Sequence, residues 1–249
     1  MPITSNVEWD GRLEAFKGRD TTAYAEATAA MAKVCAACRL ALVSGEPLSL
    51  TVAVAEGIGT DGTAYVTFDP VVSHRRCREP GLTLHEATGV PEELTTRGMR
   101  ITLEDRDSSG SWIVPALAYT LIPSVSIREP GGGLVSVLVS VLLSQGFQLC
   151  LNADYAHILQ VAGAVKDSFG CSITEQGLVT LHADGEQMYS QQLDPRDPDQ
   201  ASWLEAAREG ALIVMSGDNL DFTETGPSFD VAARLGTLVA GRVPVRTSP

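Results

Sequence analysis

Residues 48–69 read LSLTVAVAEGIGTDGTAYVTFD, and this stretch has the pattern of a β-hairpin. Aliphatic residues at positions 48, 50, 52 and 54 alternate with small or polar ones, which is the two-residue period of a half-buried strand. The segment Gly57–Gly62 is rich in turn-forming residues, and Ala64–Phe68 has the composition of a returning strand. The sequence therefore predicts two antiparallel strands with one face on a core.

The segment before this hairpin has the composition of a helix. Residues 22–44 are dense in Ala, Leu and Met and contain neither Gly nor Pro, and Ala has the highest helix propensity. Thr21 or Thr22 can cap the first turn, and Gly45 with Pro47 would end the helix. We therefore predict one long helix over residues 22–44.

Further elements follow along the chain, separated by a long connection. Residues 69–98 are predicted as a mostly irregular excursion, and 99–103 with 112–122 as a second hairpin. Asp184-Gly185 is a typical two-residue turn of a third hairpin. The remaining predictions are helices at 154–168, 200–209 and 231–243 and a buried strand at 211–217.

Residues 134–145 support two interpretations. Serines at 136, 140 and 144 are four residues apart, which places them on one face of a helix, whereas the many β-branched residues favour a strand. We take the helix. Its small-residue face offers a surface for self-association, so a homo-oligomer is one expectation.

The order of these elements predicts an α+β fold in which antiparallel hairpins pack with helices. A flexible N-terminal arm is expected at residues 1–20, a first α+β half at 21–129 and a second, similar half at 134–249. A single domain that contains both halves is the alternative.

Composition and charge limit the partners and the compartment. The 249 residues include 18 basic and 31 acidic ones, for a formal net charge of −13, which argues against binding nucleic acid or an anionic membrane. No apolar run reaches the length of a membrane span, and the N-terminus lacks the layout of a signal peptide. We expect a soluble, cytoplasmic, acidic protein. Its preference for Arg over Lys is typical of a GC-rich bacterial genome.

Three cysteines and one histidine have the spacing of zinc ligands. Cys35 and Cys38 form a C-x-x-C pair, and His74 and Cys77 form an H-x-x-C pair. Three thiolates and one imidazole are a tetrahedral zinc set. Because Cys35 and Cys38 fall inside the predicted helix, the alternative is that both are small core residues.

The segment SHRRCREP at residues 73–80 suggests a different chemistry. Arg75, Arg76 and Arg78 can bind a carboxylate or phosphate of a small-molecule substrate through forked guanidinium contacts. The same charges would favour a Cys77 thiolate as nucleophile, with His74 or His85 as the base. The alternative is a solvated loop in which the arginines pair with neighbouring carboxylates.

Arg128, Gly131 and Gly133 lie in the sequence REPGGG ahead of the apolar segment at 134–145. This pattern resembles the pyrophosphate-binding loop of the acetyl-CoA-dependent N-acetyltransferase superfamily. The resemblance implies that these three residues contact the cofactor, that Asn152 lies near the thioester and that Tyr155 acts as an acid. The alternative is a flexible connector between two halves.

Three classes of function follow from these patterns. The first is a small-molecule enzyme that acts on a polar or anionic substrate, with an undetermined reaction and no cofactor fixed by the residues themselves. The second is a non-catalytic oligomeric binding or assembly protein. The third is an adaptor stabilised by zinc. The enzyme ranks first mainly because enzymes are common among globular proteins, and the long loop that carries Arg, His and Cys supports it. An acetyl-CoA-dependent N-acetyltransferase-like enzyme is a further alternative.

Overall fold

The computed structural model describes residues 6–43, 45–58, 64–87, 94–107, 110–122, 124–128, 134–218, 220–223 and 226–248. The chain divides into two compact units. Unit 1 comprises residues 1–95 and 123–137, and unit 2 comprises residues 96–122 and 138–249. The chain therefore leaves unit 1, returns to it once and ends in unit 2. No helix among the described residues is long and apolar enough to span a membrane.

A six-stranded sheet forms the frame of unit 1. Strands β2 (Leu48–Ile58) and β3 (Ala64–His74) pair antiparallel over their full length, which confirms the hairpin predicted from residues 48–69. The other strands are β1 (Val7–Glu8) and β4 (Gly81–Ala87), both parallel to β2, and β7 (Ser124–Arg128) and β8 (Leu134–Ser136), which extend the sheet beyond β3.

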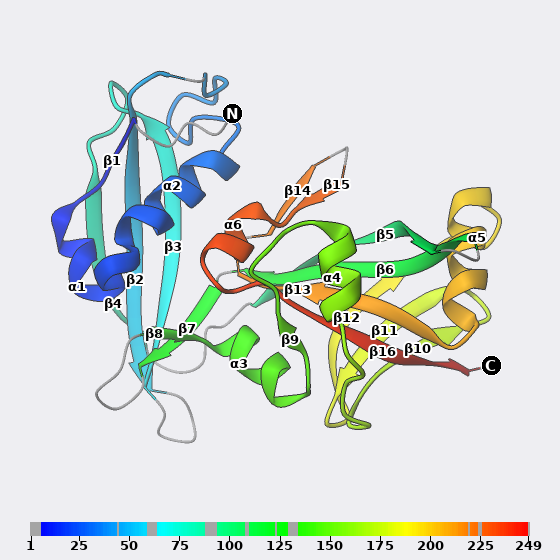
Figure 1. The fold of residues 1–249 in the computed structure, drawn as a ribbon. Coiled ribbons are helices and arrows are strands. Elements are labelled where there is room, and N and C mark those ends of the chain that lie inside the picture. Colours follow the sequence, from blue (N-terminus) through cyan, green and yellow to red (C-terminus); the bar gives the residue numbers. More distant parts are fainter. Residues whose placement is uncertain are drawn as a thin grey trace. The chain divides into compact units, whose positions relative to one another are not determined.

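Helix α2 (Thr21–Met31) packs against β2 and β3 and closes the core of unit 1 (Figure 1). The rings of Tyr24 and Phe68 lie 6.0 Å apart between centroids, and both side chains are buried. Residues 7–20, expected to be a flexible arm, also join this unit. They form β1 and three short helical segments, and Leu13 is buried. These segments are η1 (Gly11–Leu13), α1 (Glu14–Lys17) and η2 (Gly18–Asp20).

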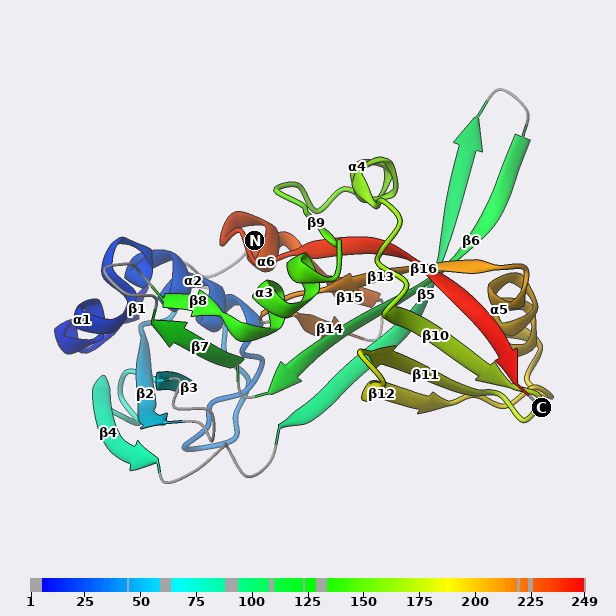
Figure 2. The ribbon, with the colours of Figure 1, turned by 90° about the horizontal axis from the view of Figure 1, so that it is seen from below.

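Unit 2 contains an eight-stranded mixed sheet in the order β12-β11-β10-β16-β13-β6-β5, with β9 paired to β16. Figure 2 shows β10, β11 and β12 as a meander beside the C-terminal strand β16. The strands are β5 (Thr95–Asp107), β6 (Gly110–Ile122), β9 (Gln148–Leu149), β10 (Phe169–Thr174), β11 (Leu178–Ala183), β12 (Glu186–Gln192), β13 (Ala211–Ser216) and β16 (Val239–Ser248). A separate pair is formed by β14 (Asp221–Thr223) and β15 (Gly226–Ser228).

Four helices accompany this sheet, and α5 illustrates why they form. The Asp197 side chain accepts hydrogen bonds from two backbone N–H groups at the start of α5, and Pro198 occupies its first turn. Trp203 on this helix is buried, and its indole N–H donates to the carbonyl of Ile101 at 2.9 Å. The helices are α3 (Val137–Ser144), α4 (Tyr155–Val161), α5 (Pro198–Arg208) and α6 (Asp230–Arg234).

The prediction of an α+β fold built from hairpins and packed helices is wrong, because the described chain is predominantly β. Several segments predicted as helix or loop belong to strands. Part of the connection at 69–98 extends β3 to His74 and supplies β4. The helix predicted at 231–243 ends at Arg234, and Gly236 reverses the chain with a φ of 67°. The residues after it form β16, which pairs with both β10 and β13.

Two other helix predictions are partly wrong. The helix predicted at 22–44 ends at Met31, since residues 33–42 bond to each other across a turn and not along a helix. Residues 134–136 form β8, and only 137–144 form a helix, so the two interpretations of 134–145 each hold for part of the segment. The turn at Asp184-Gly185, the helix near 200–209 and the strand at 211–217 are confirmed.

Gly177 and Gly185 allow a paired test of the turns in unit 2. Both have a φ of 88°, but a Cβ at Gly177 would lie 2.5 Å from the Leu193 carbonyl oxygen, whereas a Cβ at Gly185 meets nothing within 4 Å. Gly185→Ala is expected to cost about 1 kcal/mol of unfolding free energy through φ alone. Gly177→Ala is expected to cost about 3 kcal/mol because the backbone must also shift. Denaturant unfolding measures both, and equal losses would contradict the close contact at Gly177.

Candidate metal centre

The first ligand pair lies on a tight turn that follows helix α2. Val34 and Ala41 form an antiparallel bridge, and the chain between them folds back on itself. The Cys35 N–H donates to the Leu40 carbonyl at 2.8 Å, and the Arg39 N–H donates to the Cys35 carbonyl at 2.9 Å. Arg39 has a φ of 62°, so the turn is completed by a residue in the left-handed region. The C-x-x-C pair is therefore on a turn and not inside a helix.

The second ligand pair lies where strand β3 ends. His74 is the last residue of β3, and the N–H groups of Cys77 and Arg78 donate to its carbonyl at 2.9 and 3.2 Å. The Ala36 N–H donates to the Val72 carbonyl at 3.0 Å, which holds the first turn against β3. These bonds bring two segments that are 36 or more residues apart in sequence to the same place.

The ligand atoms of Cys35, Cys38, His74 and Cys77 all lie within 4.8 Å of one another. The Sγ atoms of Cys38 and Cys77 are 3.4 and 3.8 Å from His74 Nδ1. Tetrahedral zinc with typical bond lengths separates a sulfur ligand from a nitrogen ligand by about 3.5 Å. The two S···N distances therefore match a tetrahedral site, and the remaining ligand separations are no greater than 4.8 Å.

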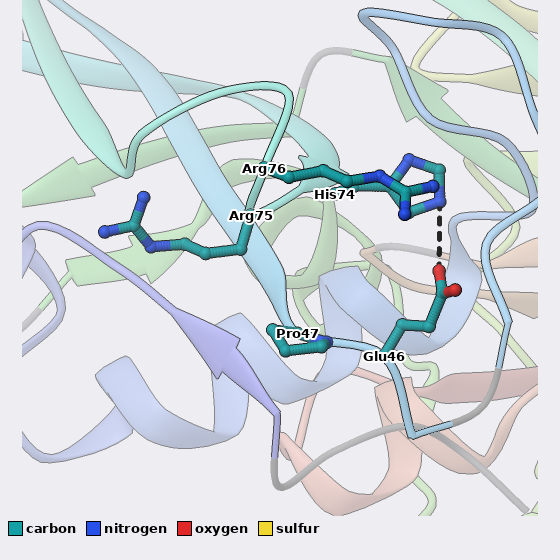
Figure 3. A pocket seen from close by; sticks show the side chains of 5 residues that line it. All are labelled: Glu46, Pro47, His74, Arg75 and Arg76. Carbon is teal, nitrogen blue, oxygen red and sulfur yellow. Dashed lines mark ion pairs between the residues drawn. The ribbon is translucent and has the colours of Figure 1, made fainter.

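The other nitrogen of His74 faces a carboxylate. His74 is almost fully buried, and its Nε2 lies 3.2 Å from Glu46 Oε2. Figure 3 shows the Glu46 carboxylate directed at the imidazole ring. When the carboxylate accepts a hydrogen bond from Nε2–H, the Nδ1 lone pair is left free to face the sulfurs. This arrangement orients histidine ligands in metal sites.

The three sulfurs influence one another's ionisation. Burial opposes ionisation of Cys35, but hydrogen bonds from the N–H groups of Cys38, His74 and Ala37 outweigh it and lower its pKa to about 5. Burial raises the pKa of Cys77, as do the hydrogen bonds and charges of the neighbouring sulfurs of Cys38 and Cys35. The surroundings therefore favour ionisation of Cys35 and oppose ionisation of Cys77.

The other two cysteines provide a contrast. Cys150 and Cys171 are buried in unit 2 and belong to its apolar core. Burial raises the pKa of Cys150 to about 11 and that of Cys171 to about 12. Both are structural thiols and serve as controls for the cluster.

The arginines predicted to bind an anion differ in their surroundings. Arg75 pairs with Glu8 at 2.7 Å and with Glu79, and these hydrogen bonds raise the pKa of its guanidinium. Arg76 and Arg78 are exposed, and neither has an ion pair among the described residues. The alternative in which the arginines pair with neighbouring carboxylates therefore holds for Arg75. Arg76 and Arg78 have no such pair among the described residues.

An open cavity of about 450 Å³ adjoins the ligand cluster. It is lined by Glu46, Pro47, His74, Arg75 and Arg76. In Figure 3 the Arg75 side chain extends away from Glu46 and His74, consistent with its pairing to Glu8 and Glu79. The cavity is thus bounded by one candidate metal ligand, its carboxylate partner, a proline and two arginines.

His85, predicted as an alternative base for Cys77, lies elsewhere. It is exposed on β4 opposite Ala55 of β2, whereas His74 is opposite Leu48. Seven residues along a strand correspond to about 23 Å. The structure therefore brings His74 and not His85 to Cys77.

The loop implied by the acetyltransferase resemblance is not followed directly by a helix. Gly131 and Gly133 lie outside the described residues, but Arg128 pairs with Leu134 across two antiparallel strands. Helix α3 begins only at Val137, whereas a diphosphate cradle requires a helix N-terminus at the glycines. Asn152 accepts a hydrogen bond from the Asp154 N–H at 2.9 Å, which shapes the turn before α4.

Sequence reasoning missed Glu46 as part of this centre. Glu46 lies eight residues after Cys38 and 28 before His74 in the sequence, so no short motif links it to either. Its place follows from the Glu46 N–H bond to Val43 and from the pairing of Leu48 with His74. Glu46 is identified as the partner of His74 only through the register of β2 against β3.

Comparisons with models of known protein families, with curated proteins and with solved structures find no match. The chemistry of this chain is therefore inferred from the geometry of the cluster.

Proposed function

We propose that the chain is a zinc-stabilised adaptor, in which Cys35, Cys38, His74 and Cys77 hold one zinc ion. The observation that carries the proposal is the convergence of three sulfurs and one imidazole nitrogen within 4.8 Å. Soft thiolates with imidazole select zinc over hard cations such as Mg²⁺ or Ca²⁺. The turn geometry at both ligand pairs and the Glu46 contact support the same conclusion.

The number of ligands favours a structural centre over a catalytic one. Four protein ligands complete a tetrahedral shell, whereas catalytic zinc keeps one position for water or substrate. The centre ties the turn after α2 to the end of β3, so its main effect is to order that end of unit 1. A protein built in this way presents a rigid surface to a partner.

An enzyme that uses Cys77 as a nucleophile and His74 as its base is the second candidate. The 3.8 Å separation between Cys77 Sγ and His74 Nδ1 is the observation that favours it. Two further sulfurs beside the same nitrogen, and a raised pKa at Cys77, favour the metal centre instead. Alkylation of the metal-loaded protein distinguishes the two, because a catalytic thiol reacts readily and a zinc-bound one is protected.

The direct test is the metal content of protein purified without chelators or affinity metals. Native mass spectrometry is expected to show one zinc per chain. After exchange for Co²⁺, the absorption spectrum should show intense d–d bands of tetrahedral geometry and thiolate charge-transfer bands. The control Cys150→Ala, at a buried thiol of unit 2, should retain the metal. A metal-free wild-type chain that also fails to take up Co²⁺ would overturn the proposal.

Glu46→Gln is expected to weaken zinc binding without abolishing it. The amide keeps the size of the side chain but replaces the charged acceptor that faces His74 Nε2 at 3.2 Å. Loss of such a partner costs about 10–100-fold in metal affinity. Competition with a chromophoric chelator measures the change. Glu56→Gln, at the far end of β2, is the matched control, and equal affinities for all three proteins would contradict the role of Glu46.

A further inference from the structure

The two turns that carry the metal ligands are the most basic part of an acidic protein. Residues 32–43 and 74–78 contain no acidic residue, although the formal net charge of the chain is −13. Arg39, Arg76 and Arg78 are exposed, and none of the three has an ion pair among the described residues. Because no described carboxylate pairs with them, these three guanidinium groups are available to a ligand.

Large aliphatic side chains are exposed on the first of these turns. Val34, Leu40 and Val43 have exposed fractions of 49%, 61% and 55%. They lie within ten residues of each other and flank the two cysteines of the first pair. Single exposed aliphatic residues are ordinary on protein surfaces, but a group of them beside unpaired charges is typical of an interaction site.

The cavity beside the cluster adds a recess to this surface. Among the described residues that line it, Glu46 faces His74 and Arg75 is paired with Glu8 and Glu79. Arg76 has no ion pair within the described part of the chain. A volume of about 450 Å³ accommodates a carboxylate side chain with room to spare.

We propose that residues 32–43 and 74–78, here called the basic-apolar surface, dock an acidic segment of a partner protein. Carboxylates of that segment pair with the free guanidinium groups, one of them entering the cavity beside Arg76. Aliphatic side chains of the segment cover Leu40 and its neighbours. This inference rests on the proposed function, because the zinc ion joins the two turns into one surface.

The composition of the surface favours a peptide over a nucleic acid. Neither turn contains Phe, Tyr or Trp, so no aromatic platform is available for stacking bases. The negative net charge of the whole chain repels a polyanion such as DNA or RNA at long range. A short acidic segment carries fewer charges and also gains from burial of the aliphatic side chains.

The test uses the full chain loaded with zinc and a short fluorescein-labelled peptide in which pairs of Glu alternate with single Leu residues. Fluorescence anisotropy is expected to show saturable binding that weakens as salt is added, and no binding of the same peptide with Lys in place of Glu.

Arg76→Gln is expected to weaken binding about tenfold, as for loss of one charge-assisted hydrogen bond. Leu40→Ser should weaken it several-fold. Arg246→Gln changes the net charge equally on unit 2 and should have no effect.

The outcomes separate this inference from the zinc centre. A zinc-loaded wild type that does not bind the Glu/Leu peptide overturns the docking surface and leaves the zinc centre intact. Equal losses for Arg76→Gln and Arg246→Gln overturn it as well, since binding would then follow net charge alone. Tighter binding of a single-stranded oligonucleotide than of the peptide would assign the surface to nucleic acid instead. Zinc content is measured for the wild type and for each variant. A wild-type chain that holds no zinc counts against the proposed function and not against the docking surface.

Discussion

Cys38→Ser is expected to release the zinc ion and to lower the unfolding free energy of unit 1 by about 4 kcal/mol or more. Serine is a much poorer zinc ligand than a thiolate, and three remaining ligands hold the ion far more weakly. The size of this stability loss distinguishes a metal ligand from an ordinary surface residue because Cys38 is exposed. Substitution at an exposed site without a metal changes stability by only about 0.5 kcal/mol.

Thermal unfolding with and without a chelator measures this effect. The wild type should lose stability when the chelator removes zinc, and Cys38→Ser should resemble the stripped wild type and respond no further. Cys77→Ser, also exposed, should behave in the same way. A Cys38→Ser protein as stable as the wild type would show that the Cys38 thiol does not bind a structural metal ion.

Trp203→Ala is expected to lower the unfolding free energy of unit 2 by about 4 kcal/mol while the zinc content stays at one per chain. The side chain is among the largest that are fully buried, and its truncation leaves a cavity beneath α5. It also removes the indole N–H from the Ile101 and Ala116 carbonyls, at 2.9 and 3.3 Å. Both carbonyls belong to strands of unit 2.

Trp203→Phe separates the two contributions. It keeps most of the apolar volume and loses the hydrogen bonds, so a loss of about 1–2 kcal/mol is expected. Near-ultraviolet circular dichroism and denaturant titration follow unit 2, and metal analysis follows unit 1. Loss of zinc in either variant would contradict the division of the chain into two units with separate cores.

The sequence predicts the local patterns well and the tertiary pairings poorly. The alternation at 48–54 identifies β2 because a half-buried strand has that period, and the turn at Asp184-Gly185 follows from the backbone freedom of those residues. Residues 33–42 and 239–243 fall within the helices predicted at 22–44 and 231–243, the first of them predicted from its Ala content. Residues 33–42 bond mainly to one another across a turn, and Ala36 bonds to Val72 of β3, whereas residues 239–248 pair with β10 and β13. No local pattern identifies these remote partners.

The metal centre shows the same limit. Spacing alone singles out Cys35, Cys38, His74 and Cys77 as a possible zinc set. The helix prediction at 22–44 then argues against the site, because a helix lacks the tight turn that a C-x-x-C pair uses. The ligand atoms converge because the chain leaves α2 at Met31 and turns against the end of β3. Glu46 enters the site through strand register, which is a property of two segments together.

The pairing of Leu48 with His74 would give the proposed zinc ion a role in the folding of the β2–β3 hairpin. A slip of one residue between two strands turns every side chain to the opposite face of the sheet. In a slipped hairpin His74 would point away from the three sulfurs, and zinc would lack its fourth ligand. Binding of the proposed zinc ion would therefore stabilise one alignment among those that the repeated Val and Ala residues of β2 permit. The proposed ion would in this way select correctly aligned chains during folding.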